Sequence, residues 1–482
     1  MAYTARDRRA RRSALLCVAA GLGLGLTCAL FAWPFLVDDA FIVARFAERL
    51  ARGAGYGFQA GPRADGVTGP LWLLPLVLAA LSGLPTVFAA KLFGLAASAG
   101  AAALVLRAAW SGQGGRAQAG WLALLLGTAG PVWLWAIGGL ETGLATCLCA
   151  WLALSALARP APRGEAAGVA AAALAWLRPE LAFWVAFQCG LVLWRDRRAG
   201  AKAFGVAIAG ALALLAFRWL QFGHLLPLSA HAKPPVLSHG IRYVFECARA
   251  TGALVLVPWI LLALARGQSR VRALAVGLLI HACAVALAGG DWMPGARLFA
   301  PLAPLACAIA ADQIAGASRR WPRAVVALAL ITLAVRAESS WRESVAARSA
   351  GATRERRLPE LLAAIAPYAG PVAALDIGAL GYFTDRTLID LGGLVEPAVA
   401  YAPGGHVAKR IDAGWLMARA PTVIVLHSRL MPRVDAQRRL RWFAGFPVER
   451  SVLAQPWVLT RFRVAQVVPY TTDYFYVILT RD

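Results

Sequence analysis

Long apolar runs separated by short polar segments dominate the pattern of the chain. A helix needs about 20 apolar residues to cross a hydrocarbon core of about 30 Å. The apolar runs of this chain lie at about residues 14–36, 71–84, 86–106, 119–137, 141–158, 166–177, 181–194, 203–217, 247–264, 273–288, 298–315 and 322–336. The pattern predicts a polytopic α-helical membrane protein.

Basic residues gather in clusters between these runs and indicate which of them cross. The clusters are Arg6, Arg8, Arg9, Arg11 and Arg12; Arg107 and Arg116; Arg159 and Arg163; Arg195, Arg197, Arg198 and Lys202; Arg266, Arg270 and Arg272; and Arg319, Arg320 and Arg323. Basic loops favour the cytoplasmic side, but if every run crossed, the cluster at Arg107 and all later ones would be exported. The run 71–84 reaches only about 21 Å as a helix, so we interpret it as an interfacial helix on the outer leaflet. About eleven transmembrane helices then cross, with the N-terminus inside, the C-terminus outside and every cluster cytoplasmic.

Two later features complete the expected domain organisation. Runs 166–177 and 181–194 are short and flank Arg178-Pro179-Glu180, so they form either two short spans or a broken hairpin whose tip lines a cavity. After Arg336, alternation of apolar and polar residues predicts a small exported α/β domain. The expected division is a transmembrane catalytic domain over residues 1–337, with an exported loop carrying interfacial helices at 38–84, and an exported α/β domain over 338–482.

The composition excludes several classes of protein. Of 482 residues, 60% are hydrophobic and only 15% are charged, whereas soluble proteins carry about 25% charged residues. The net charge of +24 would suggest nucleic acid in a soluble chain. Here the arginines lie mainly between the apolar runs, so we interpret them as a topology signal and expect no nucleic-acid partner. The eight cysteines lie within or beside apolar segments and show no disulfide framework or metal motif.

The polar residues suited to chemistry lie in the loops expected on the outer face. Asp38-Asp39 begins an amphipathic segment directly after the first run. Helix capping explains one acidic residue at that place, but it explains the second less well. A carboxylate here is a candidate general base. The Gly- and Pro-rich segment 53–70 that follows is either a flexible connection or a loop that folds over a substrate.

Three further loops contain candidate binding residues. Glu141 lies at the outer start of a run, where capping is the alternative role. The loop 218–239 contains His231 and Lys233, which could hold a phosphate, while its histidine spacing without a carboxylate is unsuited to zinc. Asp291, Trp292 and Arg297 lie in one turn, and these residue types suit sugar and phosphate recognition.

These pieces, in this order, resemble the membrane glycosyltransferases of the GT-C superfamily, and most of all the group that contains the terminal arabinofuranosyltransferases of bacterial cell envelopes. The resembling blocks are Asp-Asp-Ala-Phe-Ile (Asp38–Ile42, with Arg45), Gly-x-Thr-x-Pro-Leu-Trp (Gly66–Trp72), Gly-Leu-Glu-Thr (Gly139–Thr142), Arg-Pro-Glu (Arg178–Glu180), Gly-x-x-x-Pro…Ala-Lys (Gly223–Lys233), Gly-Gly-Asp-Trp-Met…Arg (Gly289–Arg297) and Asp-x-Gly-x-Leu-Gly-Tyr…Asp-Leu-Gly-Gly-Leu (Asp376–Leu394). The chain departs from that group in having Asp65-Gly-Val-Thr68 where Glu-Gly-Tyr-Thr is usual.

The resemblance implies transfer of a sugar, such as the pentofuranose arabinofuranose, from a polyprenyl-phosphate donor. The acceptor would be a hydroxyl of a glycan, glycolipid or protein on the outer face of the bacterial cytoplasmic membrane. The residues it implies are Asp38 and Asp39 for catalysis; Lys233, Arg297, His231 and Arg178 for the donor phosphate; and Arg45, Thr68, Trp72, Glu141, Glu180, Asp291 and Trp292 for substrate. No cofactor or metal is required, because the leaving group is already a lipid phosphate.

Two other classes of protein remain alternatives at this stage. A transporter or flippase of lipid-linked saccharides would place ionisable residues near the midplane on interrupted helices in paired repeats. No repeated segment is visible, and the polar residues gather at the expected outer ends of the runs. An envelope scaffold would leave the Asp38-Asp39 pair with no role beyond capping.

Overall fold

The computed structural model describes residues 5–61, 63–112, 114–158, 164–318, 321–471 and 474–481. Of the predicted cytoplasmic arginines, Arg159, Arg163, Arg319 and Arg320 lie outside these residues. The chain forms two compact units. Unit 1 contains residues 1–35, 90–214 and 235–348, and unit 2 contains residues 36–89, 215–234 and 349–482. The expected boundary at 337/338 therefore falls inside unit 1, and two loops of the membrane part belong to unit 2.

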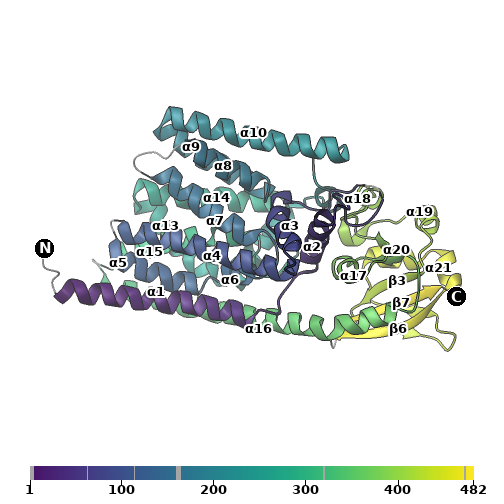
Figure 1. Ribbon diagram of the computed structural model, residues 1–482. Coiled ribbons are helices and arrows are strands. Elements are labelled where there is room, and N and C mark those ends of the chain that lie inside the picture. Colours follow the sequence, from purple (N-terminus) through teal and green to yellow (C-terminus); the bar gives the residue numbers. More distant parts are fainter. Residues whose placement is uncertain are drawn as a thin grey trace. The chain divides into compact units, whose positions relative to one another are not determined.

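Unit 1 is built from helices (Figure 1). Its helices are α1 (Ala5–Phe31), α4 (Thr86–Ser111), α5 (Gly115–Gly127), α6 (Gly130–Ala136), α7 (Thr142–Leu157), α8 (Gly164–Ala175), η2 (Pro179–Leu181), α9 (Ala182–Arg195), α10 (Arg197–Phe222), α12 (Leu237–Ala250), η3 (Ala253–Leu256), α13 (Val257–Arg266), α14 (Ser269–Leu287), η4 (Ala300–Leu302), α15 (Ala303–Ala317) and α16 (Pro322–Ile365). Helix α4 begins in unit 2, and α10 and α16 end in it.

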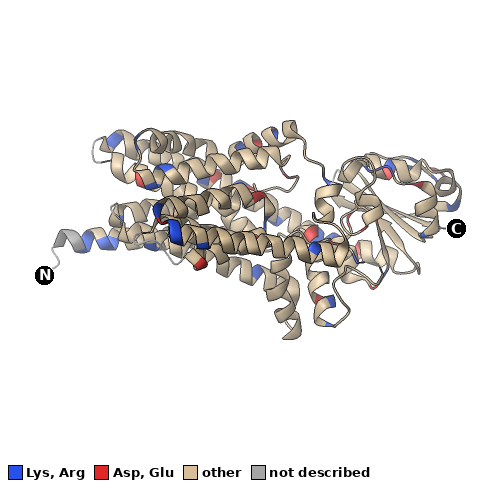
Figure 2. Ribbon diagram, turned by 90° about the horizontal axis from the view of Figure 1, so that it is seen from above, with Lys and Arg blue, Asp and Glu red and all other residues tan. Residues whose placement is uncertain are grey.

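The lengths and composition of these helices make the chain a multi-pass membrane protein. Among the residues that the structure describes, six helices are long and apolar enough to cross a membrane, or up to eight if each of two bent pairs forms one span. Long stretches of them carry no charged residue (Figure 2). The remaining predicted spans are the shorter helices α7, α8 and α9, with 16, 12 and 14 residues.

The two bends have local causes. Helices α5 and α6 meet at 60°, where Pro131 lacks the N–H group that a continuing helix would need. Helices α12 and α13 meet at 85°, and Gly252 between them adopts a left-handed conformation with φ of 64°. The predicted run at 247–264 is therefore not one straight helix, because an amphipathic helix begins at Leu237 and breaks at this glycine.

Glycines allow close packing between the helices of unit 1. Gly21 on α1 lies against the backbone of Ala123 on α5, and Gly127 on α5 lies against Gly21. Gly94 on α4 and Gly143 on α7 pack in the same way. A methyl group at any of these positions would overlap the neighbouring backbone. Small residues thus stabilise helix pairs in an apolar solvent, where close van der Waals contact is the main attraction.

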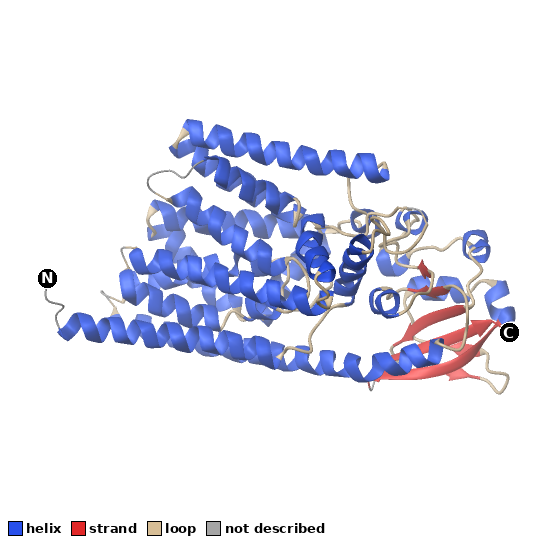
Figure 3. Ribbon diagram, in the orientation of Figure 1, coloured by secondary structure: helices blue, strands red, loops and turns tan. Residues whose placement is uncertain are grey.

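Unit 2 combines short helices with a mixed sheet (Figure 3). Its helices are α2 (Asp38–Ala51), η1 (Pro70–Trp72), α3 (Leu73–Leu81), α11 (Leu228–Ala232), α17 (Gly378–Phe383), α18 (Pro397–Ala400), η5 (His406–Ala408), α19 (Ala413–Ala418), α20 (Pro447–Leu453) and α21 (Pro456–Arg461). Its strands are β1 (Val372–Ala374), β2 (Leu388–Asp390), β3 (Val423–Ser428), β4 (Arg433–Val434), β5 (Leu440–Trp442), β6 (Phe462–Thr471) and β7 (Tyr474–Arg481).

The main sheet has the order β2-β1-β3-β7-β6. Strand β1 pairs in parallel with β2 and β3, with Val372 opposite Leu388 and Val423. Strands β3 and β7 are antiparallel, with Val423 opposite Thr480, and β6 adds to the other side of β7. All six residues of β3 are buried, as a central strand covered on both faces requires.

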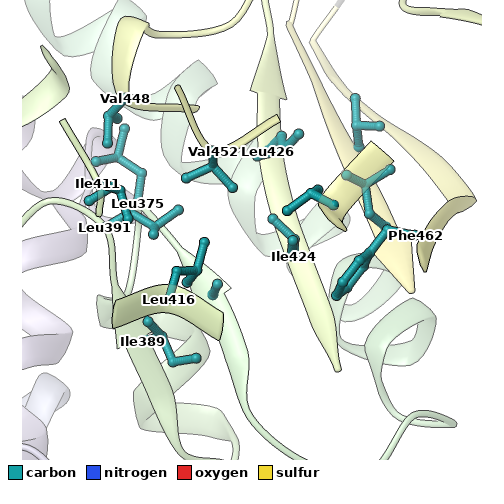
Figure 4. Close-up of a cluster of buried hydrophobic side chains, with 14 of the residues drawn as sticks. Leu375, Ile389, Leu391, Ile411, Leu416, Ile424, Leu426, Val448, Val452 and Phe462 are labelled. Atoms are coloured by element: carbon teal, nitrogen blue, oxygen red, sulfur yellow. The ribbon is translucent and has the colours of Figure 1, made fainter. Parts of the chain in front are cut away.

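An apolar cluster fixes helices α18, α19, α20 and α21 of unit 2 to one face of this sheet (Figure 4). Ile424 and Leu426 on β3 alternate toward the cluster, and Leu416 on α19 and Val448 and Val452 on α20 cover them. Each side chain of this kind stabilises the fold by about 1.5–3 kcal/mol when fully buried. The carboxyl ends of the parallel strands are thereby held in a fixed register.

Two predicted elements of unit 2 can now be compared with the fold. The run 71–84 forms η1 and the nine-residue α3, which is about 14 Å long. It is too short to cross, in agreement with the interfacial interpretation. The first strand of the α/β part begins at Val372, and α16 continues as one helix from the predicted last span to Ile365. Its later half is rich in Ala, Arg, Glu and Leu, which favour helix.

The predicted orientation can be tested by cysteine labelling at exposed positions. We expect a membrane-impermeant thiol reagent added to intact cells to modify Ala60→Cys and Ala436→Cys, and to modify Ser111→Cys only after permeabilisation. All three side chains are exposed in the structure, so a difference reports the side of the membrane. The parent protein carries an exposed Cys283 and measures the background. Labelling of Ser111→Cys in intact cells would contradict the predicted topology.

Candidate functional site

Asp38 in the first turn of α2 is bound to a distant segment of unit 2. Its two carboxylate oxygens accept hydrogen bonds from the backbone N–H groups of Gly378 (2.7 Å) and Ala379 (2.8 Å), at the start of α17. A side chain at residue 378 would overlap Asp38, so this contact requires glycine. Capping of the helix that they begin was the alternative role for one of the two adjacent carboxylates. Asp38 instead caps another helix, and both carboxylates lie at one edge of the sheet domain.

The carboxyl ends of the parallel strands carry further charged groups beside Asp38. Asp376 follows β1, and His427 is the fifth residue of β3. The imidazole of His427 is 1% exposed, and its Nε2 lies 3.1 Å from Asp376 Oδ2. Its Nδ1 lies 2.6 Å from Glu449 Oε1 on α20. Burial alone would lower the pKa of His427, but the two carboxylates outweigh it and raise the pKa to about 10.

The electrostatics distinguish two of these carboxyl groups. Burial, and next the negative charge of Asp376, raise the pKa of Asp38 to about 7, while the amide hydrogen bonds oppose the rise. The protein around Asp376 partly desolvates its carboxyl group and raises the pKa, but the charge and hydrogen bond of His427 outweigh this effect and hold the pKa below its usual value. Asp376 is thus the ionised group of the pair, and Asp38 can exchange a proton near neutral pH.

Lys233 and His406 lie in the same neighbourhood as Asp39. Burial, and next the positive charge of Lys233, lower the pKa of His406 to about 4, while Asp39 and Asp376 act in the opposite direction. His406 Nδ1 lies 2.9 Å from the carbonyl oxygen of Gly392, to which it donates its proton. His406 is therefore a neutral imidazole near pH 7, and its Nε2 is an acceptor.

The other predicted residues of unit 2 make contacts within that unit. The guanidinium of Arg45 donates to the carbonyl oxygens of Phe58 (2.5 Å) and Thr384 (2.8 Å). Thr68 Oγ1 lies 2.9 Å from Ser229 Oγ, and Trp72 is fully buried. The ring of His231 lies 4.7 Å from that of Tyr401. These contacts tie the loop regions of unit 2 together.

The residue that departs from the resembling group also has a defined role. Asp65 Oδ2 accepts a hydrogen bond of 2.8 Å from Arg218 Nε, and both side chains are almost fully buried. Arg218 Nη2 donates to the carbonyl oxygen of Thr68. Asp65 therefore helps to fix the segment that precedes η1.

In unit 1, Arg178 joins two of the predicted carboxylates. Its Nε lies 2.6 Å from Glu180 Oε1, and its Nη1 lies 3.3 Å from Glu141 Oε1. Nη1 also donates to Thr142 Oγ1 at 3.0 Å. Arg178 is only 2% exposed, so the turn between α8 and α9 is built around a buried charge cluster. A buried arginine between two carboxylates is compensated in charge.

A second polar group of unit 1 surrounds Arg297. Arg297 Nε donates to Asp291 Oδ2 at 2.8 Å, and the guanidinium lies 5.8 Å from the ring centroid of Trp135. Asp291 Oδ1 accepts from the backbone N–H of Trp292, whose indole is largely exposed. The charge of Arg297 also acts on Glu180, so the two polar groups of unit 1 are neighbours.

The structure thus divides the predicted residues between two units. Unit 2 holds Asp38, Asp39, Arg45, Thr68, Trp72, His231 and Lys233, and unit 1 holds Glu141, Arg178, Glu180, Asp291, Trp292 and Arg297. Sequence reasoning missed Asp376, His406, His427 and Glu449. Asp376 begins one of the resembling blocks, which was a usable signal, whereas His427 lies in an ordinary apolar strand sequence.

Comparison with known proteins supports the fold. A crystal structure of ArnT from Cupriavidus metallidurans bound to undecaprenyl phosphate has a TM-score of 0.59 and 14% identity, over 96% of this chain and 97% of that one. The structure of the same protein in the apo state has a TM-score of 0.57 and 13% identity, over the same shares. The chain therefore shares the fold of ArnT along nearly its whole length.

Comparison by sequence gives one match, to the C-terminal part of the chain. The family model of a domain of unknown function, DUF8728, matches residues 341–478, which is less than a third of the chain. No curated protein sequence matches this chain significantly. The identity with ArnT is low, so that likeness describes the fold and not the substrate.

Proposed function

We propose that the protein is a membrane glycosyltransferase that moves a sugar from a polyprenyl-phosphate donor to an acceptor hydroxyl. The observation that carries the proposal is the group of Asp38, Asp39, Lys233 and His406 in unit 2, where carboxylates and a cation lie in one neighbourhood. A sugar transferase without a nucleotide donor needs both charges: a base for the acceptor and a cation for the phosphate.

The reaction uses these groups in one displacement. Asp38 takes the proton of the acceptor hydroxyl. At the same time, the oxygen of that hydroxyl forms a bond to the anomeric carbon of the sugar. The bond from that carbon to the phosphate oxygen breaks, and its electron pair stays on the lipid phosphate. The products are the glycoside and polyprenyl phosphate, and the proton resides on the carboxyl group. A base with a pKa of about 7 is well matched to this task.

Two independent similarities support the lipid donor. ArnT, which shares the fold, binds undecaprenyl phosphate in the crystal. The blocks from Asp38 to Leu394 resemble polyprenyl-phosphate-dependent arabinofuranosyltransferases, so a pentofuranose such as arabinofuranose is the first sugar to test. The proposal places this chemistry on the outer face of the bacterial cytoplasmic membrane.

The decisive experiment is an assay of purified protein with a panel of polyprenyl-phosphate sugars. We expect one of these donors to release free polyprenyl phosphate and to transfer its sugar to a glycan, glycolipid or protein acceptor. Asp38→Asn should lower the yield of both products together. Movement of the intact donor across vesicles without release of polyprenyl phosphate would contradict the proposal and favour a flippase.

The role of Lys233 in donor binding can be tested separately. A hydrogen bond to a charged group contributes about 1.5–3 kcal/mol, so Lys233→Ala should raise the KM for the donor about 10- to 100-fold. Lys202→Ala is the matched control, because it removes a lysine whose ammonium pairs with Glu165 on the surface. Both variants are compared in donor titrations at saturating acceptor.

The KM for the donor is measured in the same way for the alanine variants of Arg297, Arg178 and His231. Each alanine variant reports whether that cation also serves the phosphate. An unchanged KM for the donor in Lys233→Ala would exclude Lys233 from the phosphate site.

A further inference from the structure

The sheet of unit 2 has a topological feature that favours ligand binding. Strand β1 is followed along the chain by β2 on one side and later by β3 on the other, so the order reverses between β1 and β3. Loops at the carboxyl ends of parallel strands separate at such a point, and ligands bind in the resulting crevice. Asp376 follows β1 and His427 lies near the end of β3, so both lie at this reversal.

Glu449 holds His427 in a fixed position. Glu449 Oε1 accepts from the Nδ1 and from the backbone N–H of His427, at 2.6 and 2.7 Å. Its Oε2 accepts from the backbone N–H of Phe446 at 2.8 Å. The rings of Tyr474 and Tyr476 lie 5.5 and 4.9 Å from the imidazole. The ring can neither rotate nor shift without breaking several of these contacts.

The fixed imidazole presents its second nitrogen to Asp376. The side chain of Asp376 is 47% exposed, whereas those of His427 and Glu449 are 1% and 0% exposed. If this chain of hydrogen bonds only stabilised the sheet, its outer member would not need to be an exposed carboxylate. Instead, the buried carboxylate of Glu449 and the buried imidazolium of His427 support the exposed carboxylate of Asp376. Asp376 lies next to the segment 378–379 that binds Asp38.

The charged and titratable groups around Asp38 come from several elements. Asp376 and Asp39 are negative neighbours. Arg354 of α16 and the phenols of Tyr470 and Tyr476 also interact electrostatically with Asp38. Around Asp376 lie His427, His406 and the tyrosines of β6 and β7. Arg354 favours the ionised form of Asp38, whereas the negative charge of Asp376 favours the protonated form.

We propose that Asp376 is a positioning residue of the acceptor site: the His427–Glu449 pair fixes its carboxylate two residues before the backbone that binds Asp38, so that its negative charge acts on the base. Its role in transfer rests on the proposed function. The effect of the charge of Asp376 on the proton affinity of Asp38 is independent of that function, and it can be measured without any substrate.

The test replaces Asp376 by Asn, which keeps an oxygen that can accept from His427. Infrared difference spectra of the full-length protein should show a carboxyl group that titrates near pH 7 in the parent and is missing in Asp38→Asn. In Asp376→Asn this titration should move to lower pH, toward the ordinary value of 3.8. Asp385→Asn is the matched control, because it removes an exposed carboxylate of the same unit and should leave the titration unchanged.

A second measurement needs no variant. Histidine NMR of the parent should show one imidazolium that persists to a pH of about 10. A set of histidines that are all neutral at pH 8 would overturn the proposal even if Asp376→Asn does not fold. An unchanged carboxyl titration in folded Asp376→Asn would overturn it as well.

The pH dependence of transfer separates this proposal from the proposed function. If the parent transfers sugar, the acidic limb of its kcat/KM profile should shift to lower pH in Asp376→Asn and remain in place in Asp385→Asn. Transfer with an unshifted limb would leave the function intact and refute the role of Asp376. Absence of transfer with every donor, together with the shifted infrared titration, would refute the function and support the coupling of the two carboxylates.

Discussion

Asp38→Asn is expected to lower sugar transfer by about 10²- to 10⁴-fold, the usual loss when a general base is removed. The same change should cost only about 0.5–2 kcal/mol of stability, which is the range for loss of a helix cap. Asn keeps one oxygen, so one of the two bonds to Gly378 and Ala379 can persist. Turnover and thermal unfolding are measured on the same preparation, because the two magnitudes separate catalysis from capping.

Two comparisons make the result specific. Asp39→Asn should cause a smaller loss of rate, since Asp38 is the proposed base and Asp39 is its neighbour. Asp412→Asn alters a true cap, whose side chain accepts from Trp415 N at 2.7 Å at the start of α19. It should change stability slightly and leave turnover at the parent value. Near-normal transfer in both Asp38→Asn and Asp39→Asn would show that the base lies outside this pair.

Arg178→Ala is expected to destabilise the protein by about 3–5 kcal/mol, because removing one partner leaves buried charges uncompensated. Glu180 and Glu141 would lose their cation in a part of the chain with little access to water. The measurement is the midpoint of thermal or denaturant unfolding in detergent, followed by donor binding in whatever fraction remains folded.

The paired variant Arg178→Met with Glu180→Gln should recover much of this stability, since it removes opposite charges together. Arg342→Ala is the control for loss of a surface arginine, because its partner Glu338 lies one turn away and both are exposed. That change should cost no more than about 1 kcal/mol. Equal losses in Arg178→Ala and Arg342→Ala would show that the cluster around Arg178 is not a buried ion-pair network.

Local pattern was sufficient for the apolar helices of the membrane part. The long runs at 14–36 and 86–106 correspond to α1 and α4, because a bilayer forces any crossing segment to be apolar and helical over a defined length. The short run 71–84 was recognised by the same arithmetic. Asp38 and Asp39 were singled out as candidates because two adjacent carboxylates directly after an apolar run are unusual for an ordinary cap.

The hydropathy pattern did not predict the helix breaks and helix ends that depend on backbone conformation. The break at Gly252 and the bend near Pro131 divide runs that look continuous in hydropathy. The continuation of α16 to Ile365 was missed, because the end of the apolar stretch was taken as the end of the helix. The residues of a helix become more polar beyond the apolar part of a membrane, but the backbone hydrogen bonds of the helix can continue unchanged.

The sequence by itself determined the class of protein, the membrane segments and the carboxylate pair, since these follow from local hydrophobicity and from residues adjacent in the chain. Only the tertiary structure decided what surrounds that pair. Asp38 meets Gly378 across 340 residues, and His427 meets Asp376 across 51. Such contacts arise from strand register and helix docking, which depend on the packing of the whole sheet domain and leave no periodic signal in the sequence.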